Sequence, residues 1–209
     1  MNNIKFEIKR GEKIGIIGPS GSGKSTLMDI ISGILKPEKG DIKVDEKSIF
    51  SNLRGWQDLI GYIPQKIFIL DDSLKNNIIF GFDKNKIDEK ILLKLIHKIN
   101  LTQLLERLPK GLDSKLGEKG LNISAGEIQR IGIARALIYN PTIIFLDEAT
   151  SSLDIYTETQ ILEELNQFKD KTFISVAHRI NTLKNCDNIY RLDKGTIIDS
   201  GNFEKFNNF

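Results

Sequence analysis

The sequence predicts an α/β fold in which a mainly helical segment interrupts a sheet-containing core. Short apolar runs of strand length lie near both ends of the chain, and turn residues bound them. In the middle of the chain, leucine and isoleucine recur instead at the spacing of amphipathic helices. We therefore expect a single domain over residues 1–209, with a core of residues 1–65 and 141–209 and a helical subdomain of residues 66–140.

The first half of the predicted core contains four strand signals and one helix. Ile4–Ile8 alternates apolar and charged residues, which is typical of a half-buried strand. Lys13–Ile17 is an apolar run that leads into a glycine-rich loop, and a helical spacing of apolar residues follows over Leu27–Ile34. Ile42–Val44 and Ile60–Ile63 are shorter strand signals.

The second half of the core follows the helical segment, which runs from about Ser73 to Tyr139. One helical stretch, Glu158–Phe168, lies among the strand signals of this half. We expect the core to contain a mixed sheet. The expected strands of the second half are Thr142–Leu146, Thr172–Val176, Asn188–Leu192 and Thr196–Ile198.

Composition and charge exclude several classes of protein. Of 209 residues, 40% are hydrophobic and 28% are charged, and no apolar run approaches the roughly 18 residues that span a bilayer. The 30 basic and 28 acidic residues give a net charge of +2, which is too balanced for a nucleic-acid-binding face, so no nucleic acid partner is expected. Cys186 is the only cysteine, which excludes an internal disulfide and fits a reducing cytoplasm.

The loop between the second strand and the first helix matches the phosphate-binding pattern G-x-x-x-x-G-K-[ST]. Its glycines let backbone N–H groups point at an anion, and the helix N-terminus adds a positive partial charge. A turn without a ligand is disfavoured, because a strand precedes the loop and a helix follows it. The pattern predicts a P-loop NTPase core in which Lys24 reaches the outer phosphates and Ser25 is a ligand for Mg²⁺. The loop alone does not separate ABC proteins, which bind ATP, from GTPases or small-molecule kinases. The expected nucleotide-binding residues are Gly18, Pro19, Ser20, Gly21, Ser22, Gly23, Lys24, Ser25 and Thr26.

Acidic residues and a histidine follow two later strands of the predicted core. Asp147 ends an apolar strand, where it can hold Mg²⁺, and Glu148 can act as the general base toward water. His178 follows the next strand and can contact the γ-phosphate or the water. Structural roles remain the alternative: the carboxylates can cap the next element, and a lone histidine is more often structural.

Asn122–Arg130 resembles the signature motif of ABC ATPases, usually written L-S-G-G-Q. It precedes an apolar helix, so Ser124 and Gly126 stand at a helix N-terminus, which favours anion binding. In that family the motif completes the site of the opposite subunit and faces its γ-phosphate. The expected signature residues are Ser124, Ala125, Gly126 and Glu127.

Further segments resemble the other motifs of this family, in the same order along the chain. Tyr62–Gln65 resembles the Q-loop, Ser151–Asp154 the D-loop and Ala177–Arg179 the H-loop. The resemblance covers essentially the whole chain and identifies it as an ABC transporter nucleotide-binding domain. It implies the catalytic residues Glu148, His178, Gln65 and Lys24, the metal ligands Ser25, Gln65 and Asp147, and the D-loop residues Ser151, Ser152, Leu153 and Asp154.

Two segments are similar to those of exporters and flippases. Leu116–Gly120 is similar to the exporter segment that touches the transmembrane coupling helices. Pro64–Phe68 followed by Ser73–Ile78 is similar to the exporter pattern after the Q-loop. The resemblance therefore implies a transmembrane domain as partner, a homo- or heterodimer closed by ATP, and a peripheral location at the cytoplasmic face of the cell (inner) membrane.

The sequence also departs from the family pattern. Ala125 replaces the first glycine of the signature pair, and Glu127 replaces glutamine. Family members carry an adenine-stacking aromatic residue about two dozen positions before the phosphate loop, and Met1 lies too close to Gly18 for this chain to include it. Phe6 belongs to the apolar face of its segment and is no substitute. We expect a truncated antiparallel β lobe and ATP binding weaker by about tenfold or more.

Two other classes of function stay open from the sequence. A soluble ABC ATPase of DNA repair, chromosome packing or translation is one, although those proteins carry long coiled coils or paired cassettes, and neither pattern occurs here. An inactive, nucleotide-gated interaction module or fragment is the other, although Lys24, Asp147, Glu148 and His178 are all present.

Overall fold

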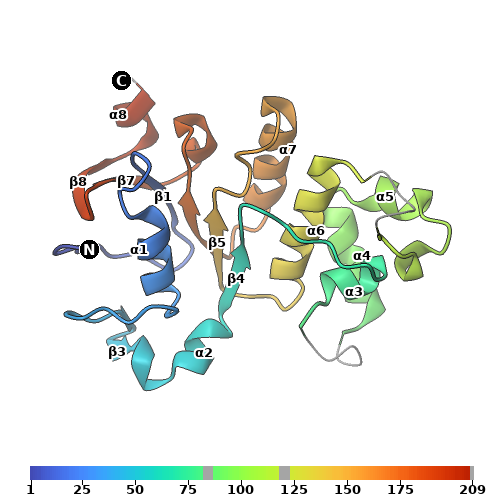
Figure 1. Ribbon diagram of the computed structural model, residues 1–209, viewed down its shortest axis with the longest axis horizontal. Coiled ribbons are helices and arrows are strands. Elements are labelled where there is room, and N and C mark those ends of the chain that lie inside the picture. Colours follow the sequence, from blue (N-terminus) through green and yellow to red (C-terminus); the bar gives the residue numbers. More distant parts are fainter. Residues whose placement is uncertain (82–86, 118–122, 208–209) are drawn as a thin grey trace. The chain divides into compact units, whose positions relative to one another are not determined.

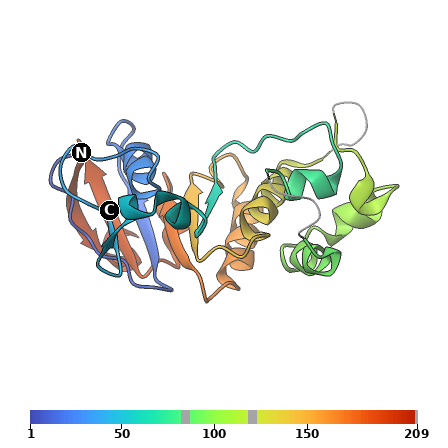
Figure 2. The ribbon, with the colours of Figure 1, turned by 90° about the horizontal axis from the view of Figure 1, so that it is seen from below.

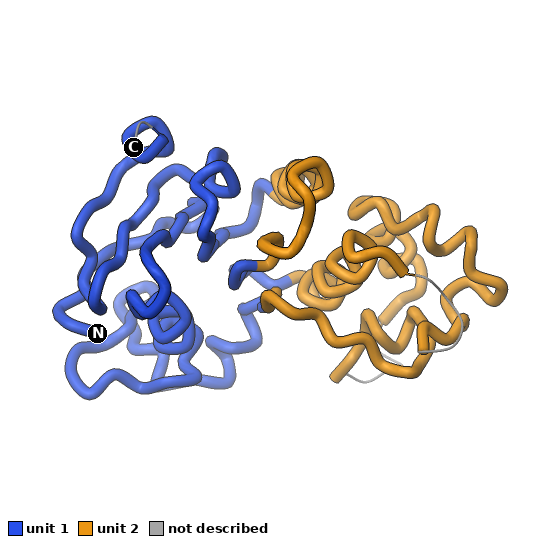
Figure 3. The backbone as a smooth tube through the Cα atoms, turned by 45° about the horizontal axis from the view of Figure 1, so that its top comes forward, with its two compact units in different colours: residues 1–62, 141–148, 169–209 blue, residues 63–140, 149–168 orange. Residues whose placement is uncertain are grey.

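The computed structural model divides the chain into two compact units (Figure 3). It describes residues 1–81, 87–117 and 123–207. Unit 1 comprises Met1–Tyr62, Pro141–Glu148 and Lys169–Phe209, and unit 2 comprises Ile63–Asn140 and Ala149–Phe168. Unit 2 thus differs from the expected helical segment, 66–140, mainly in taking Ala149–Phe168 from the second half of the core. The reason is that α7 (Ile155–Asn166) contacts α6 (Ala125–Leu137).

Unit 1 contains a sheet with the strand order β4-β5-β6-β1-β7-β8, which confirms the α/β fold with a mixed sheet (Figure 1). The neighbours β5, β6, β1 and β7 are parallel, and β8 is antiparallel to β7. The strands are β1 Lys13–Ile17, β4 Ile60–Ile63, β5 Ile143–Asp147, β6 Thr172–Val176, β7 Asn188–Asp193 and β8 Thr196–Gly201. The helices of this unit are α1 Lys24–Ile31, α2 Leu53–Gln57 and α8 Phe203–Asn207, and the short strands β2 Lys43–Val44 and β3 Lys47–Ser48 form a hairpin.

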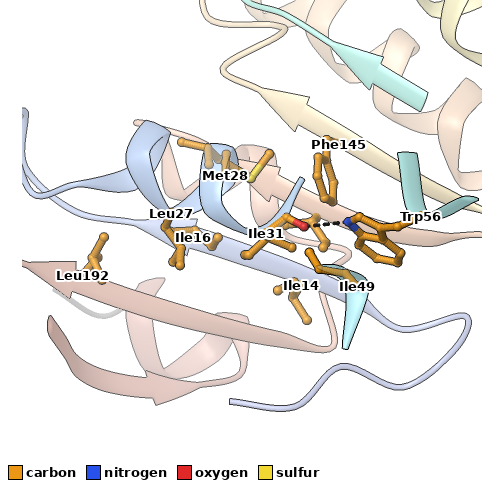
Figure 4. Packing of buried hydrophobic residues seen from close by; sticks show 11 residues of the cluster. Ile14, Ile16, Leu27, Met28, Ile31, Ile49, Trp56, Phe145 and Leu192 are labelled. Carbon is orange, nitrogen blue, oxygen red and sulfur yellow. Dashed lines mark hydrogen bonds between the residues drawn. The ribbon is translucent and has the colours of Figure 1, made fainter. Parts of the chain in front are cut away.

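The core of unit 1 packs α1 against the central strands (Figure 4). Strand β1 lies between β6 and β7, and its middle residues are buried, as are all five residues of β6. Trp56 of α2 closes one end of this core, where its Nε1 donates to the carbonyl oxygen of Ile31 at 2.9 Å. The last carbonyls of a helix have no partner inside the helix, so this bond satisfies one of them in a buried position.

The strand predicted over Ile4–Ile8 is wrong, because these residues form no strand. The alternation itself is present: Ile4, Phe6 and Ile8 are partly buried and pack against the core of unit 1. The ring of Phe6 lies 5.1 Å from that of Tyr190, centroid to centroid, which confirms that Phe6 belongs to the core. An alternating pattern predicts which face is buried, but a strand also needs a neighbouring backbone to which it can hydrogen-bond.

Unit 2 is built from helices around α6, which contacts α3, α4 and α7 (Figures 1 and 2). The other helices are α3 Leu74–Ile78, α4 Glu89–Lys98 and α5 Thr102–Arg107. A buried ion pair links α6 to α7, with Arg130 Nη2 at 2.6 Å from Glu164 Oε1. Asn100 donates to the same carboxylate oxygen at 2.9 Å, so the buried charge is both paired and hydrogen-bonded. Within the described ranges, no helix has the length and apolar character needed to cross a membrane.

Candidate nucleotide site

The glycine-rich loop lies in unit 1 between the end of β1 and the start of α1. A Cβ atom at Gly18 would lie 2.2 Å from the carbonyl oxygen of Leu192 and 2.7 Å from Ser22 Oγ, so this position has no room for a side chain. The ammonium group of Lys24 donates to the carbonyl oxygens of Gly18 and Pro19, at 2.9 and 3.1 Å. The loop therefore folds tightly around a buried lysine, as the phosphate-binding pattern requires.

Features of this loop fit a bound phosphate. Gly21 and Gly23 have φ values of +76° and +103°, in the left-handed region that favours glycine. Gly23 is the N-cap of α1 and supplies no side-chain cap, so the first N–H groups of the helix can bind an external anion. Ser22 Oγ is buried and has no hydrogen-bond partner among the residues that the structure describes. Ser20, Ser25 and Thr26 are exposed.

The residues of unit 1 also fit a magnesium ion held at the nucleotide. A P-loop site uses one hydroxyl and one carboxylate from the protein and oxygen atoms from phosphate and water for the rest. Ser25 is the second residue of α1, and Asp147 ends β5. The described residues contain no group of three or more His, Cys, Asp or Glu side chains that could hold a metal ion. Ser25 and Asp147 supply the hydroxyl and the carboxylate that such a site takes from the protein.

Asp147 has a partner that the sequence does not reveal. Tyr62 Oη of β4 donates to Asp147 Oδ2 at 2.7 Å. Burial and this hydrogen bond raise the pKa of Tyr62 above its usual value, so the phenol stays protonated and keeps its role as donor. The sequence pattern identifies Tyr62 only as the start of the Q-loop segment. The contact follows from β4 and β5 being neighbours in the sheet, which sequence spacing alone cannot show.

Glu148 and His178 lie together beyond the ends of β5 and β6. Glu148 Oε1 is 2.7 Å from His178 Nε2, and the carboxylate side chain is 15% exposed whereas the imidazole is 46% exposed. The backbone N–H of Glu148 donates to Val176 at 3.0 Å, which extends the ladder between the two strands. Glu148 has a φ of +51°, a left-handed conformation that costs a non-glycine residue about 1–2 kcal/mol. Strain of this kind persists only where the surrounding structure holds the residue in place.

Gln65 and the D-loop lie together in unit 2. Gln65 Nε2 donates to Ser151 Oγ at 3.3 Å. Leu153 is buried, and Asp154 caps the N-terminus of α7 by accepting a hydrogen bond from the backbone N–H of Thr157 at 3.0 Å. The hydroxyl of Thr157 donates to the same carboxylate, and both bonds hold the pKa of Asp154 below its usual value. This cap explains why α7 begins before the predicted helix at Glu158.

The signature segment forms the start of α6. Ser124 is its N-cap, and Ala125 is the first helical residue, a position that needs no positive φ. The replacement of glycine by alanine is therefore compatible with the backbone. Gly126 is buried, and a Cβ there would lie 2.9 Å from Thr157 Cγ2, so a larger residue would require the Thr157 side chain to shift. Asn122 lies outside the described residues.

The described parts of the two exporter-like segments lie side by side in unit 2. The backbone N–H of Leu74 donates to Ser114 at 3.0 Å, and that of Leu116 donates to Asp72 at 2.9 Å. Ser73 caps α3 by accepting a hydrogen bond from the N–H of Asn76. The first of the predicted contact segments, Leu116–Gly120, falls partly outside the described residues, from position 118 onward.

The predicted site residues thus form two groups. The phosphate loop, Asp147, Glu148 and His178 belong to unit 1, where the parallel strands β1, β5 and β6 bring their carboxyl ends to the same edge of the sheet. Gln65, the signature and the D-loop belong to unit 2.

Comparisons with known proteins agree with these motifs. The chain is 39% identical over 203 residues to a putative export ATP-binding/permease protein of Rickettsia bellii, a match that covers 96% of this chain and 35% of that protein. It is 36% identical over 204 residues to an ATP-dependent lipid A-core flippase of Shewanella denitrificans, a match that covers 96% of this chain and 34% of that protein. The chain therefore spans about a third of the length of these relatives.

A solved structure and a family model also match this chain. The structure of a bacterial Atm1-family ABC exporter with ATP bound matches with a TM-score of 0.86 and 33% identity, over 96% of this chain and 35% of that one. The model of the family described as ABC transporter matches residues 1–151. The chain belongs to the ABC transporter family.

Proposed function

We propose that this chain is the nucleotide-binding domain of an exporter-type ABC transporter, and that it hydrolyses ATP to drive transport through a transmembrane domain. The observation that carries the proposal is the pair Glu148 and His178, 2.7 Å apart, at the sheet edge where β1 leads into the phosphate loop. The names of the relatives, which are exporters and a flippase, favour this function over that of a soluble, non-transport ABC ATPase.

In the proposed reaction a water molecule attacks the γ-phosphorus of ATP in line with the bond to ADP. Glu148 accepts a proton from the water as the new P–O bond forms, and the bond to ADP breaks, which releases ADP and phosphate. Lys24 and the backbone N–H groups of the loop stabilise the charge on the phosphate oxygens. Mg²⁺ at Ser25 and Asp147 would neutralise part of that charge.

His178 and Tyr62 position these groups. A carboxylate can only accept a hydrogen bond, so the contact of 2.7 Å implies that His178 Nε2 carries the hydrogen and orients Glu148 when Glu148 is ionised. Tyr62 does the same for Asp147, because it donates to one carboxylate oxygen and fixes the direction of the other.

The active form that we propose is a head-to-tail pair of domains closed around two ATP molecules. Each site would combine the phosphate loop, Gln65, Asp147, Glu148 and His178 of one domain with Ser124 and Gly126 of the other. The position of Ser124 and Gly126 at the N-terminus of α6 supports this role, because the helix dipole favours an anion there. Such a domain would lie at the cytoplasmic face of the membrane, attached through its transmembrane partner.

The solution mass of Glu148→Gln with and without Mg-ATP tests the proposal. Removal of the base should stop turnover but leave nucleotide binding intact, so ATP should convert the monomer into a dimer in size-exclusion chromatography with light scattering. Glu163→Gln is a matched control, because Glu163 is an exposed residue of α7. That variant should hydrolyse ATP like the unmodified chain and should not accumulate as a dimer.

The outcomes separate the competing functions. Steady-state hydrolysis by Glu148→Gln would remove Glu148 from the role of base. A chain that binds ATP but stays monomeric would contradict the proposed head-to-tail dimer with two enclosed ATP molecules, which we call the sandwich. A chain without measurable affinity for ATP would support the inactive module instead.

A further inference from the structure

Glu127, which stands where the family motif has glutamine, is the centre of a hydrogen-bond network in unit 2. Its Oε2 accepts from the backbone N–H of Ser124 at 2.8 Å and from Ser124 Oγ at 3.1 Å. Arg107 Nη2, at the end of α5, lies 3.1 Å from both carboxylate oxygens. We call Arg107, Ser124 and Glu127 the acidic signature network.

The first part of this network is a capping box, which glutamine would form equally well. Ser124 Oγ accepts from the backbone N–H of Glu127 at 3.2 Å, and the Glu127 side chain returns to the N–H of Ser124. Capping therefore explains a residue of this length at position 127, but it does not explain a charge. The charge interacts favourably with the helix dipole and with Arg107, and it also acts on any anion that approaches Ser124 from outside.

In the proposed sandwich that approaching group is the γ-phosphate of the partner's ATP, so this inference rests on the proposed function. A carboxylate within 3.1 Å of the Ser124 hydroxyl would repel the phosphate. It would also compete with the phosphate for the hydroxyl hydrogen, which can rotate toward only one acceptor at a time. Glutamine would not repel the phosphate, and its neutral oxygen would compete less strongly for the hydroxyl hydrogen.

The contact of Arg107 with Glu127 reduces both the repulsion of the phosphate and the competition for the Ser124 hydroxyl hydrogen. Its guanidinium balances the charge and hydrogen-bonds the carboxylate, so Ser124 can turn its hydroxyl toward the phosphate. The Arg107 side chain is 50% exposed and that of Glu127 is 17% exposed, and such a partly hydrated pair adds little to the stability of a free domain. Closure of the sandwich would exclude water, and an uncompensated carboxylate would then become costly.

We propose that Arg107 is a positioning residue for ATP hydrolysis, which makes the acidic signature of this chain compatible with the partner's γ-phosphate by compensating Glu127. The residue acts through Glu127 and Ser124 and needs no contact with ATP itself.

The test measures the ATP concentration for half-maximal dimerisation of variants made in the Glu148→Gln chain. Arg107→Ala should raise it about tenfold, because the unbalanced carboxylate repels the phosphate. Adding Glu127→Gln to Arg107→Ala should return the ATP concentration for half-maximal dimerisation to within about threefold of the parent value, because glutamine keeps the capping box without the charge. Arg107→Lys should lie between Arg107→Ala and the parent, because it keeps the charge without the forked geometry.

Arg54→Ala is the matched control, because Arg54 forms an exposed pair with Asp58 at 3.0 Å in unit 1. It should leave dimerisation unchanged. Affinity for ADP, which lacks the γ-phosphate, should be unchanged in every variant. Circular dichroism and the thermal midpoint without nucleotide check that each variant is folded.

The possible results separate this inference from the function on which it rests. If the parent dimerises and Arg107→Ala dimerises equally well, Arg107 is not a positioning residue, whereas the proposed sandwich dimer is still supported. If Glu127→Gln does not rescue Arg107→Ala, Arg107 does not act by compensating Glu127 and the inference is overturned. A parent that stays monomeric with Mg-ATP overturns the sandwich, and this inference with it.

Discussion

His178 Nε2 lies 2.7 Å from Glu148 Oε1, and the two residues follow the neighbouring parallel strands β6 and β5. The backbone of Glu148 is held by its bond to Val176 and by a left-handed conformation, so its side chain leaves the strand end in a defined direction. The imidazole then fixes the carboxylate. This arrangement links a strained backbone position to the orientation of the proposed base.

His178→Ala should therefore slow hydrolysis without preventing nucleotide binding. Loss of the orienting contact should lower single-turnover hydrolysis by about 100-fold, within the range typical of general acid–base catalysis. Affinity for ATP should change by less than about threefold, because Lys24 and the loop remain. The other histidine, His97, provides the control, since it pairs with Thr102 in unit 2. A His178→Ala enzyme with normal turnover would show that the pair is structural.

Tyr62→Phe should weaken metal-dependent nucleotide binding while the fold is preserved. The change removes only the hydroxyl that holds Asp147 Oδ2, and a hydrogen bond of this kind contributes about 0.5–1.5 kcal/mol, so a loss of several-fold is expected. The measurement is the Mn²⁺ concentration needed for half-maximal binding of ATP. Tyr139→Phe is the control, because its hydroxyl contacts the carbonyl oxygen of Ile79 in unit 2. Equal Mn²⁺ dependence in both variants would contradict a positioning role for Tyr62.

Gly18→Ala should abolish tight nucleotide binding and destabilise unit 1. Its Cβ would lie 2.2 Å from the carbonyl oxygen of Leu192, so the backbone of the loop or of β7 must shift. Gly40→Ala is the control for left-handed strain alone, since Gly40 has a φ of +85° and a Cβ added there would meet nothing within 4 Å. Thermal unfolding and binding of a fluorescent ATP analogue measure the two effects. Binding by Gly18→Ala at the level of Gly40→Ala would show that the loop adapts without loss.

Cys186 should react slowly with alkylating reagents in the native chain. Burial raises the pKa of its thiol to about 12, and the charge of Asp187 acts in the same direction. Since the thiolate is the reactive form, labelling at pH 8.5 should be at least about tenfold slower in the folded chain than in urea. Equal labelling rates in the folded and unfolded chain would contradict this environment.

The raised pKa of the Cys186 thiol also predicts that the folded chain loses stability at alkaline pH. A thiol whose pKa is raised by folding contributes its full stability below the unfolded value of 9.0, and that contribution decreases as the pH rises toward the folded value. Cys186→Ala should therefore lose less stability than the unmodified chain between pH 7.5 and pH 10.5. The difference between their urea midpoints at these two pH values isolates the thiol from other groups that titrate in the same range.

The sequence predicted the parts of the site that depend on local order along the chain. Lys13–Ile17 and Thr172–Val176 are strands with the expected bounds, and the phosphate loop follows β1 as its pattern requires. Apolar runs of this kind are buried on both faces of a parallel sheet, so their hydrophobic signal is strong. Residues 4–8 show the limit of that signal, because the correct alternation did not produce a strand without a neighbour for it to pair with.

The sequence by itself determined the chemistry that we propose for this protein, and the tertiary structure decided which groups contact one another. Lys24, Asp147, Glu148 and His178 could be named from their motifs, because each is defined by a few neighbouring residues. The contacts of Tyr62 with Asp147 and of Arg107 with Glu127 could not, since they join positions 85 and 20 residues apart. Such contacts depend on which strands are neighbours in the sheet and on how helices pack, and no local pattern encodes that choice.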